Sequence, residues 1–213
     1  MGKKKKKWRK VVKKRMKKAT LHEAAKRYRT EYPIFNYRWE HVKSVVKLSL
    51  KLAELTGADA EVVEAAAWLH DVAKQKAKGD HPEVGAKIAR KVLSKTDFPQ
   101  EKIESVAYAI EMHMGLWRDK PLKNLEAAVL WDADKLAKIG LTAAFHWMGA
   151  EFARESMVTT SGLVSVGQAV DWHDKTVESM HTEPAKRAAA SRLKRYTKLW
   201  EELDMELKAE DLK

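Results

Sequence analysis

AAAWLHDVAK, residues 65–74, is the stretch of sequence that decides the fold. Its three alanines, tryptophan and leucine are typical of the buried side of a helix. His70 and Asp71 then stand side by side in the apolar run, which Val72 and Ala73 resume. A buried carboxylate costs several kcal/mol unless another group pairs with it or binds it. The stretch therefore predicts a buried helix with a charged group that needs a partner.

Apolar residues recur at helical spacing along most of the remaining chain. Asp59 is a suitable N-cap for the helix that holds the opening stretch and continues a little beyond Lys74. Pro82 and Pro99 stand where the first turns of two later helices are expected. The spacing also predicts that the helix from Pro82 has an apolar face through Leu93 and that the helix from Pro99 includes His113. Further helices are expected over 39–55, 122–139, 142–155, 165–180 and 185–208. Since no alternating strand pattern and no internal repeat occurs, we expect a compact, multi-helix, all-α fold.

The composition limits the class of protein. A length of 213 residues suits one domain, or one domain with an appendage. Apolar residues make up 45% and charged residues 34% of the chain, which is typical of a globular body. No apolar run approaches the roughly 20 residues that span a bilayer, and the basic N-terminus lacks the apolar segment of a secretory signal. Because the chain has no cysteine, disulfides and thiolate metal sites are excluded, and we expect a reducing, cytoplasmic location.

The net charge of +12 is concentrated at the N-terminus. Residues 1–20 hold 12 basic side chains and no acidic one, while the rest of the chain carries as many acidic as basic residues. Apolar residues recur among these lysines at near-helical spacing: Trp8, Val11, Val12, Met16 and Ala19. We expect a basic tail over 1–20, helical or disordered, before a body over 21–213. Residues 3–18 would bind nucleic acid or another anionic surface, or would only keep the chain soluble.

Several other ionisable side chains occupy apolar helix positions. His113 lies on the buried stripe of its helix, His41 stands near the start of another, and Asp134 lies inside a uniformly apolar one. His81 stands beside them at a loop-to-helix junction. A divalent cation among these groups would keep Asp71 ionised and the histidines neutral. Imidazole and carboxylate ligands on facing helices can surround a metal in this way.

His70 and Asp71 alone do not make a metal site. Adjacent helix positions point about 100° apart, so the two side chains can flank a metal but not chelate it by themselves. The other ligands must come from other helices, and His41 and Asp134 are the best placed. Mixed ligation of this kind does not select one ion, so Mn, Fe, Co, Ni and Mg all remain candidates.

The alternative is that these histidines are ordinary core residues. A single buried histidine is usually hydrogen-bonded to backbone, and one His-Asp pair has little meaning by itself. The stretch VDWHDK supplies a comparison within the chain, because it holds a second pair, His173 and Asp174, among polar residues. We expect this second pair at the surface.

The order of these residues resembles the HD-domain metal-dependent phosphohydrolases. His41, the pair His70 and Asp71, and Asp134 match the order of that family's motifs, and the resemblance covers roughly 35–140, with further helices over 141–213. LHDVAK is similar to the HD-x-x-K form, and RWEH to the Arg-x-x-His of nucleotide-hydrolysing members. GDHPEVGAKIA, IEMHMG and WDADKLAKIG resemble later family segments, and SMHTEPAKRAAASRLKRYTKLWEEL resembles the C-terminal helix of small members near nucleotide pyrophosphohydrolases and phosphodiesterases.

The resemblance implies roles for individual residues. One divalent metal would be held by His41, His70, Asp71 and Asp134, and Asp71 would bridge to a second ion held by His81 and His113. Phosphate oxygens would contact Arg38, Lys74 and Lys135. If only one ion binds, His81 or His113 would act as acid or base. Catalysis would then depend on Asp71, Lys74, His81 and His113.

The chain departs from the family pattern at two places. Two-metal diesterases often have a histidine pair at the later segment, but here Met114 follows His113. The DAD segment offers Asp132 and Asp134, which lie about 200° apart around a helix, so both cannot face one metal. Asp134 has the family position before Lys-Leu, although Asp132 also lies on an apolar face.

These residues lead to three hypotheses about function. The first is a metal-dependent phosphohydrolase that acts on a nucleotide or another small phosphate ester. The second is a phosphodiesterase that the basic tail brings to RNA. The third is a non-catalytic sensor that binds a metal or a nucleotide. Lys74, Lys135 and Arg38 favour the enzymes, because a purely structural metal cage does not need them. The sequence does not indicate an oligomeric state.

Overall fold

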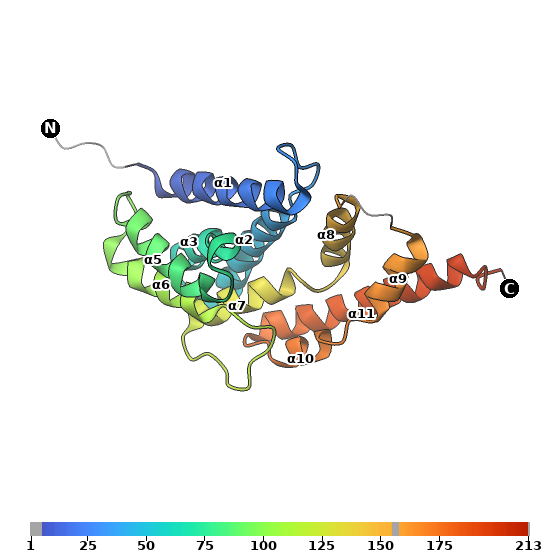
Figure 1. Ribbon diagram of the computed structural model, residues 1–213. Helices are drawn as coiled ribbons and strands as arrows, with labels where there is room; N and C mark the ends of the chain where they lie inside the picture. The colour runs from blue at the N-terminus through green and yellow to red at the C-terminus, as the bar shows by residue number, and fades with distance from the viewer. Residues whose placement is uncertain (1–5, 155–157, 213) are drawn as a thin grey trace.

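The computed structural model describes residues 6–154 and 158–212 and confirms an all-α fold (Figure 1). The larger part holds α1 (Trp8–Tyr28), α2 (Tyr37–Thr56), α3 (Ala60–Leu69), α4 (Lys74–Ala77), α5 (His81–Leu93), α6 (Ile103–Met112) and α7 (Leu125–Leu136). Short 3-10 turns η1 (Lys78–Asp80) and η2 (Gln100–Lys102) precede α5 and α6. A second part holds α8 (Leu141–Phe152), α9 (Thr160–Gln168), α10 (His173–Glu178) and α11 (Glu183–Leu207).

Helix α3 is the centre of the larger part. All of its residues from Val62 to Leu69 are buried, and it contacts α1, α2, α5, α6 and α7. The side chain of Asp59 accepts hydrogen bonds from the backbone N–H groups of Glu61 and Val62, so the predicted N-cap is confirmed. A helix that is apolar on all sides must be covered on all sides, which explains why its neighbours surround it.

The opening helix ends earlier than the sequence predicts. We expected it to continue past Lys74, but α3 stops at Leu69 and a turn over 70–73 leads into α4. Asp71 therefore lies in a buried turn and not within a helix. The apolar pattern does continue through Val72 and Ala73, because this turn is itself covered by protein.

The basic N-terminal segment is a helix that packs on the body. Trp8, Val12 and Met16 belong to the main apolar core, with exposed fractions of 4%, 0% and 0%. Their lysine and arginine neighbours lie on the exposed face of α1. The alternative that the basic tail is disordered is therefore wrong for residues 8–20. The helix also continues without a break through residue 20, where we expected the tail to end.

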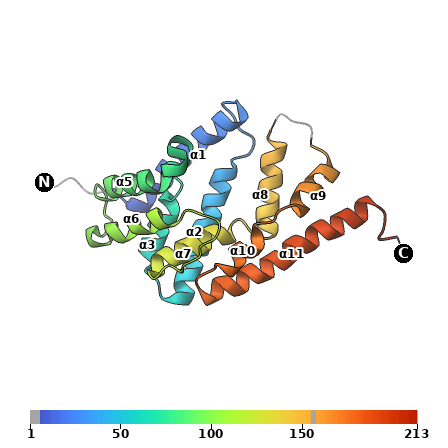
Figure 2. The same ribbon diagram turned by 60° about the horizontal axis from the view of Figure 1, so that its bottom comes forward.

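Helices α8–α11 form a C-terminal lobe beside the main core (Figure 2). Its own small core consists of Ala144, Val164, Tyr196 and Trp200. A Cβ on Gly167 would lie 2.3 Å from the Trp200 ring, so only glycine lets α9 approach α11 this closely. The expected single helix over 165–180 is wrong, because α9 ends at Gln168 and α10 begins at His173.

Within the described ranges, no helix combines the length and the apolarity that crossing a membrane requires.

Candidate metal centre and active site

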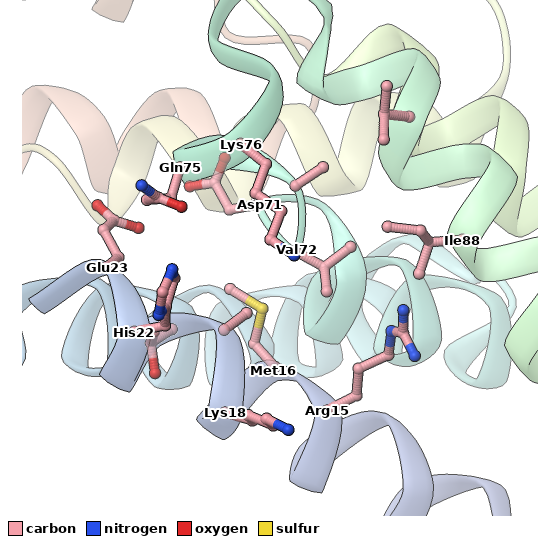
Figure 3. Close-up of a pocket in the computed structure, with 14 residues that line it drawn as sticks. Arg15, Met16, Lys18, His22, Glu23, Asp71, Val72, Gln75, Lys76 and Ile88 are labelled. Atoms are coloured by element: carbon pink, nitrogen blue, oxygen red, sulfur yellow. The ribbon is translucent and has the colours of Figure 1, made fainter. Parts of the chain in front are cut away.

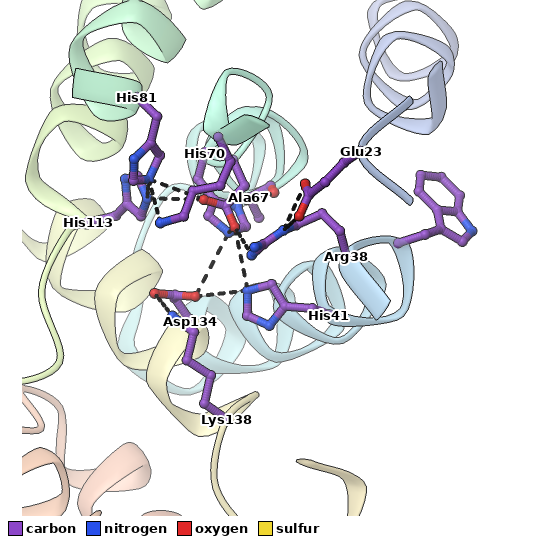
Figure 4. Close-up of polar contacts among 12 residues, drawn as sticks. Glu23, Arg38, His41, Ala67, His70, His81, His113, Asp134 and Lys138 are labelled. Carbon is purple, nitrogen blue, oxygen red and sulfur yellow. Dashed lines mark hydrogen bonds and ion pairs between the residues drawn. The ribbon is translucent and has the colours of Figure 1, made fainter. Parts of the chain in front are cut away.

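The side chains of the expected site come from separate elements and meet at one point (Figure 4). His41 projects from the first turns of α2, His70 caps the C-terminus of α3, and Asp71 follows it in the turn. Asp134 reaches the same point from α7. Each of these side chains is at most 5% exposed, so the cluster lies inside the protein.

Four donor atoms surround this point. The Nε2 atom of His41 lies 3.0 Å from Oδ1 of Asp134 and 4.0 Å from Oδ2 of Asp71. The Nε2 atom of His70 lies 3.5 Å from Oδ2 of Asp71 and 3.9 Å from Oδ1 of Asp134. Atoms at these separations can reach a shared cation with small movements of their side chains.

The hydrogen bonding of the cluster fits a divalent cation. His70 contacts the carbonyl oxygen of Ala67 through Nδ1 at 2.8 Å, which fixes the ring and turns Nε2 toward the cluster. No hydrogen bond satisfies His41 Nε2, His70 Nε2 or Asp134 Oδ1, although all three are buried. Buried polar atoms without partners are rare in folded proteins and call for an explanation such as an ion. Two imidazoles and two carboxylates are a suitable donor set for a divalent cation.

A second group of donors lies on the other side of Asp71. Its Oδ1 atom is 3.2 Å from Nε2 of His81 and 3.7 Å from Nε2 of His113. The two imidazole Nε2 atoms lie 3.2 Å apart, and His113 is fixed by a contact from Nδ1 to the carbonyl oxygen of Ile110. These three side chains are close enough to hold a cation together. Met114, which follows His113, is half exposed and lines the cavity beside this group.

Arg38 is the direct charge partner of Asp71. Its NH1 group contacts Oδ2 of Asp71, and its Nε group lies 3.3 Å from a carboxylate oxygen of Glu23 on α1. The guanidinium group therefore links the basic helix to the carboxylate at the centre. Sequence reasoning missed Glu23, whose signal is a buried acid on the apolar side of a helix rich in lysine.

Lysine side chains surround Asp134. Its Oδ2 atom accepts hydrogen bonds from Lys135 and, at 2.8 Å, from Lys138. Lys135 is fully buried and also donates to the carbonyl oxygen of His113, at 2.7 Å. Lys138, whose side chain is 25% exposed, was missed in the sequence, although it follows Asp134 by four positions. Lys74 stands beside the second group, with Nζ 3.2 Å from Nε2 of His81.

Burial and charge set the protonation states of the cluster. Burial opposes ionisation of Asp71 and Asp134, but the cations Arg38 and Lys135 beside them outweigh it and hold both pKa values well below the usual range. Burial lowers the pKa of His41 and of His113 to about 4, so both imidazoles are neutral at neutral pH. Neutral imidazoles and ionised carboxylates are the forms that bind metals.

The structure gives the two acids of the DAD segment different surroundings. Asp132 is fully buried and accepts hydrogen bonds from the backbone N–H groups of His181 and Thr182, both at 2.8 Å, and from the Thr182 hydroxyl at 2.7 Å. These residues directly precede α11, so Asp132 ties the start of that helix to α7. Asp134 alone of the pair faces His41 and His70.

The second His-Asp pair is only half as expected. Asp174 is exposed, but His173 is 4% exposed, so its predicted surface position is wrong. Its ring lies 4.1 Å from that of Trp172 and 4.6 Å from that of Tyr196, measured between centroids. Tyr196 comes from α11, so polar sequence neighbours gave no sign of this burial.

Two cavities reach Asp71. One of about 190 Å³ is lined by Lys74, His81, His113, Lys135 and Lys138 among others. The other, of about 490 Å³, lies between α1 and the segment over 71–76 (Figure 3). Arg15, Lys18 and His22 line the α1 side of this larger cavity.

Comparison with known proteins gives a family for the central part of the chain. The model of the HD domain family matches residues 38–139, close to the expected 35–140. A tRNA (cytidine(56)-2'-O)-methyltransferase of Thermoplasma volcanium is 40% identical over 62 residues, which are 29% of this chain and 18% of that protein. The chain therefore spans only a small part of that relative.

Solved structures share the fold over nearly the whole chain. A predicted HD superfamily hydrolase from an uncultured Thermotogales bacterium aligns with a TM-score of 0.61 and 21% identity, over 94% of this chain and 91% of that one. Bacillus subtilis YpgQ in complex with ADP aligns with a TM-score of 0.62 and 19% identity, over 94% of this chain and 97% of that one. An HD-superfamily hydrolase of Bacillus thuringiensis aligns with a TM-score of 0.58 and 18% identity, over 95% of this chain and 99% of that one. At these identities the likeness shows the fold.

Proposed function

We propose that this chain, whose residues 38–139 match the HD domain family and whose fold is that of HD-superfamily hydrolases, is a metal-dependent phosphohydrolase of nucleotides or other small phosphate esters. One observation carries the proposal. Buried, unpaired imidazole and carboxylate atoms converge in the protein interior, with lysine side chains around them. That combination suits both a cation and the phosphate that the cation would polarise.

We assign the metal to His41, His70, Asp71 and Asp134. With a divalent cation bound, the site would gain a water of lowered pKa and positive charge opposite the phosphoryl oxygens. Mn, Fe, Co, Ni and Mg remain the candidate ions. The residues of this chain orient the donors: Ala67 fixes His70 through its carbonyl oxygen, and Lys135 and Lys138 hold Asp134.

His81 and His113 take one of two roles in the proposal. With Asp71 they form a donor group that fits a second cation. If one cation binds, the pair instead holds or moves a proton, since their Nε2 atoms lie 3.2 Å apart beside the cavity. Lys74 is close enough to His81 to influence either role.

Phosphate binding is divided among the cations by their surroundings. Arg38 already contacts Glu23 and Asp71, and Lys135 already contacts Asp134 and the His113 backbone, so these two orient carboxylates at least as much as they meet substrate. Lys74 and Lys138 line the smaller cavity and are less buried than Lys135. We propose that these two lysines hold the phosphate oxygens.

The test is release of phosphate or pyrophosphate by the purified protein. Nucleoside triphosphates, monophosphates and cyclic nucleotides are supplied with Mn, Co, Ni or Mg, and with a chelator. Asp71→Asn should abolish turnover, while Asp174→Asn, at the exposed acid of the second His-Asp pair, should retain it. Equal activity of the two variants would exclude the assigned centre. Metal binding without turnover of any substrate would favour the sensor hypothesis.

A second candidate substrate is RNA, and the surface of α1 favours it. Exposed basic residues line that helix: Arg9, Lys10, Lys13, Lys14, Arg15, Lys17 and Lys18. Because α1 is fixed to the core, this charge is held beside the larger cavity, which reaches Asp71. Such a surface fits a polyanion. The name of the Thermoplasma relative refers to tRNA, which is a further reason to propose RNA here.

Substitution tests this candidate better than deletion. Removal of residues 1–20 would also remove Trp8, Val12 and Met16 from the core. We expect Lys10→Gln, Lys14→Gln and Lys17→Gln together to weaken binding of a single-stranded RNA and to reduce the slope of log K against log salt by about 2.

The matched control makes the same change at exposed lysines of α11, Lys186, Lys194 and Lys198. Equal losses in both triple variants would mean that only the net charge matters, and would remove α1 as an RNA site.

The lack of cysteine supports a cytoplasmic location, which we retain as part of the proposal.

A further inference from the structure

An aromatic cavity of about 270 Å³ lies between the main core and the C-terminal lobe. Its ring-bearing lining residues come from α2, α8, α11, the first residue of α10 and the residue before it: Tyr37, Trp147, Trp172, His173 and Tyr196. None of them was assigned a role from the sequence. The family match ends at residue 139, so the lobe that supplies most of this lining lies outside it.

The cavity adjoins the candidate metal centre through two residues. Lys138 lines both this cavity and the smaller cavity at Asp71, and its Nζ lies 2.8 Å from Oδ2 of Asp134. Tyr37 lines the aromatic cavity, and its ring is nearly parallel to that of His41, at an angle of 4° and 6.3 Å between centroids. A ligand in the aromatic cavity would therefore lie close to both the phosphate-binding lysine and a candidate metal ligand.

The chemistry of the lining selects a class of ligand. Aromatic side chains bind nucleobases by stacking, and the contribution does not depend strongly on which base is bound. Tyr37, Trp147 and Trp172 are partly exposed, whereas Tyr196 and His173 are buried and hold their part of the lining in place. The Tyr196 hydroxyl donates to the carbonyl oxygen of Gly167, at 3.3 Å, and so fixes the ring.

We propose that this aromatic cavity is the nucleobase subsite of a nucleotide whose phosphate lies at Lys138. The inference rests on the proposed function and deepens it, since it names a nucleoside as the part of the substrate that is recognised. Lys138 marks the junction between the two ends of the ligand. The aromatic cavity thus becomes the determinant that separates nucleotides from other phosphate esters.

Binding to the metal-free protein tests the subsite without any need for turnover. AMP, GMP, CMP and UMP are titrated in the presence of a chelator, beside ribose 5-phosphate, with calorimetry as the readout. At least one nucleotide should bind about 5- to 150-fold more tightly than ribose 5-phosphate, which is the range that stacking of one base provides. Equal affinity, or no nucleotide binding, would overturn the subsite.

Two variants act on the cavity in opposite ways. Trp172→Ala removes a wall, and Ala143→Phe fills the space, because Ala143 also lines the cavity. Both should lose the nucleotide preference while remaining folded and keeping the Mn²⁺ affinity of the wild type. Phe145→Ala, which removes an exposed ring on α8 outside the cavity, is the control and should bind nucleotides normally.

The outcomes separate this inference from the proposed function. Nucleotide binding that both variants lose, in a protein without phosphohydrolase activity, would support the subsite and contradict the function. Turnover of phosphate esters with no difference between nucleotides and ribose 5-phosphate would support the function and overturn the subsite. If both variants bind nucleotides as well as the wild type, the cavity is a packing gap of the C-terminal lobe.

Discussion

Replacement of each acid of the DAD segment should separate stability from metal binding. Asp132 is fully buried and accepts hydrogen bonds from the backbone N–H groups of His181 and Thr182. Asp132→Ala would leave both donors buried without a partner, and each such loss costs about 1–3 kcal/mol. We expect a loss of about 2–6 kcal/mol in the free energy of unfolding. Asp132 has no contact with His41 or His70, so metal affinity should be preserved.

Asp134→Asn should have the opposite profile. It keeps the shape of the side chain but removes the charge that faces His41 and His70, so Mn²⁺ affinity should fall by about two orders of magnitude or more.

Thermal unfolding of the metal-free variants and calorimetric titration with Mn²⁺ measure the two effects. For a chain of this length, about 1 kcal/mol corresponds to about 2–4 °C, so Asp132→Ala should lower the midpoint by about 4–24 °C. Titration is carried out well below the lower midpoint, so that every variant is folded. The reasoning would be refuted if Asp132→Ala lost metal affinity at full stability while Asp134→Asn bound Mn²⁺ normally.

Three further changes test other parts of the structure. In the metal-free protein, the free energy of unfolding should fall as pH drops from about 6.5 to about 4, because His41 and His113 are protonated in the unfolded chain but stay neutral in the folded one. Protonation of Asp71 and Asp134 should extend the loss below about pH 4. Urea unfolding across this pH range measures the effect, and a flat profile would contradict the neutral histidines. Arg38→Met should raise Mn²⁺ affinity by about tenfold or more, because a cation leaves Asp71, while Arg27→Met, which removes a contact with Glu23, should not. Equal affinities of the two variants would mean that Arg38 does not oppose the metal. Gly167→Ala should destabilise the protein by about 1–3 kcal/mol through its clash with Trp200, whereas Gly79→Ala, whose added Cβ meets no atom within 4 Å, should not. Equal melting temperatures of the two variants would contradict the close packing of α9 on α11.

Much of the fold follows from helical spacing, and the exceptions have tertiary causes. The pattern predicted α2, α5, α8 and α11 nearly as observed, since each has an apolar stripe that a core must cover. It did not predict the end of α3 at Leu69, because the apolar residues that follow are buried in a turn that periodicity cannot distinguish from a helix. It also did not predict that α1 packs on the core, since the lysines concealed how fully its apolar stripe is buried.

The site residues that could be predicted are those whose sequence neighbours already mark them as unusual, namely ionisable side chains among apolar residues. His41, His70, Asp71, His113 and Asp134 stand at apolar positions, and the structure brings them together with His81. Lys138 was missed because a partly exposed lysine just beyond a helix has no special pattern. His173 was misplaced because Tyr196, from another helix, covers its ring. The burial of His173 depends on a contact with a distant segment, which helical spacing alone does not predict.

Diffraction from crystals soaked with Mn²⁺, with data collected at the manganese absorption edge, tests the central claim most directly. The account predicts an anomalous peak within bonding distance of His41 Nε2, His70 Nε2, Asp71 Oδ2 and Asp134 Oδ1. A second peak beside Asp71 Oδ1, His81 and His113 would decide in favour of two ions. A soaked crystal with no peak among the first four atoms, or with peaks only at surface carboxylates, would contradict the account.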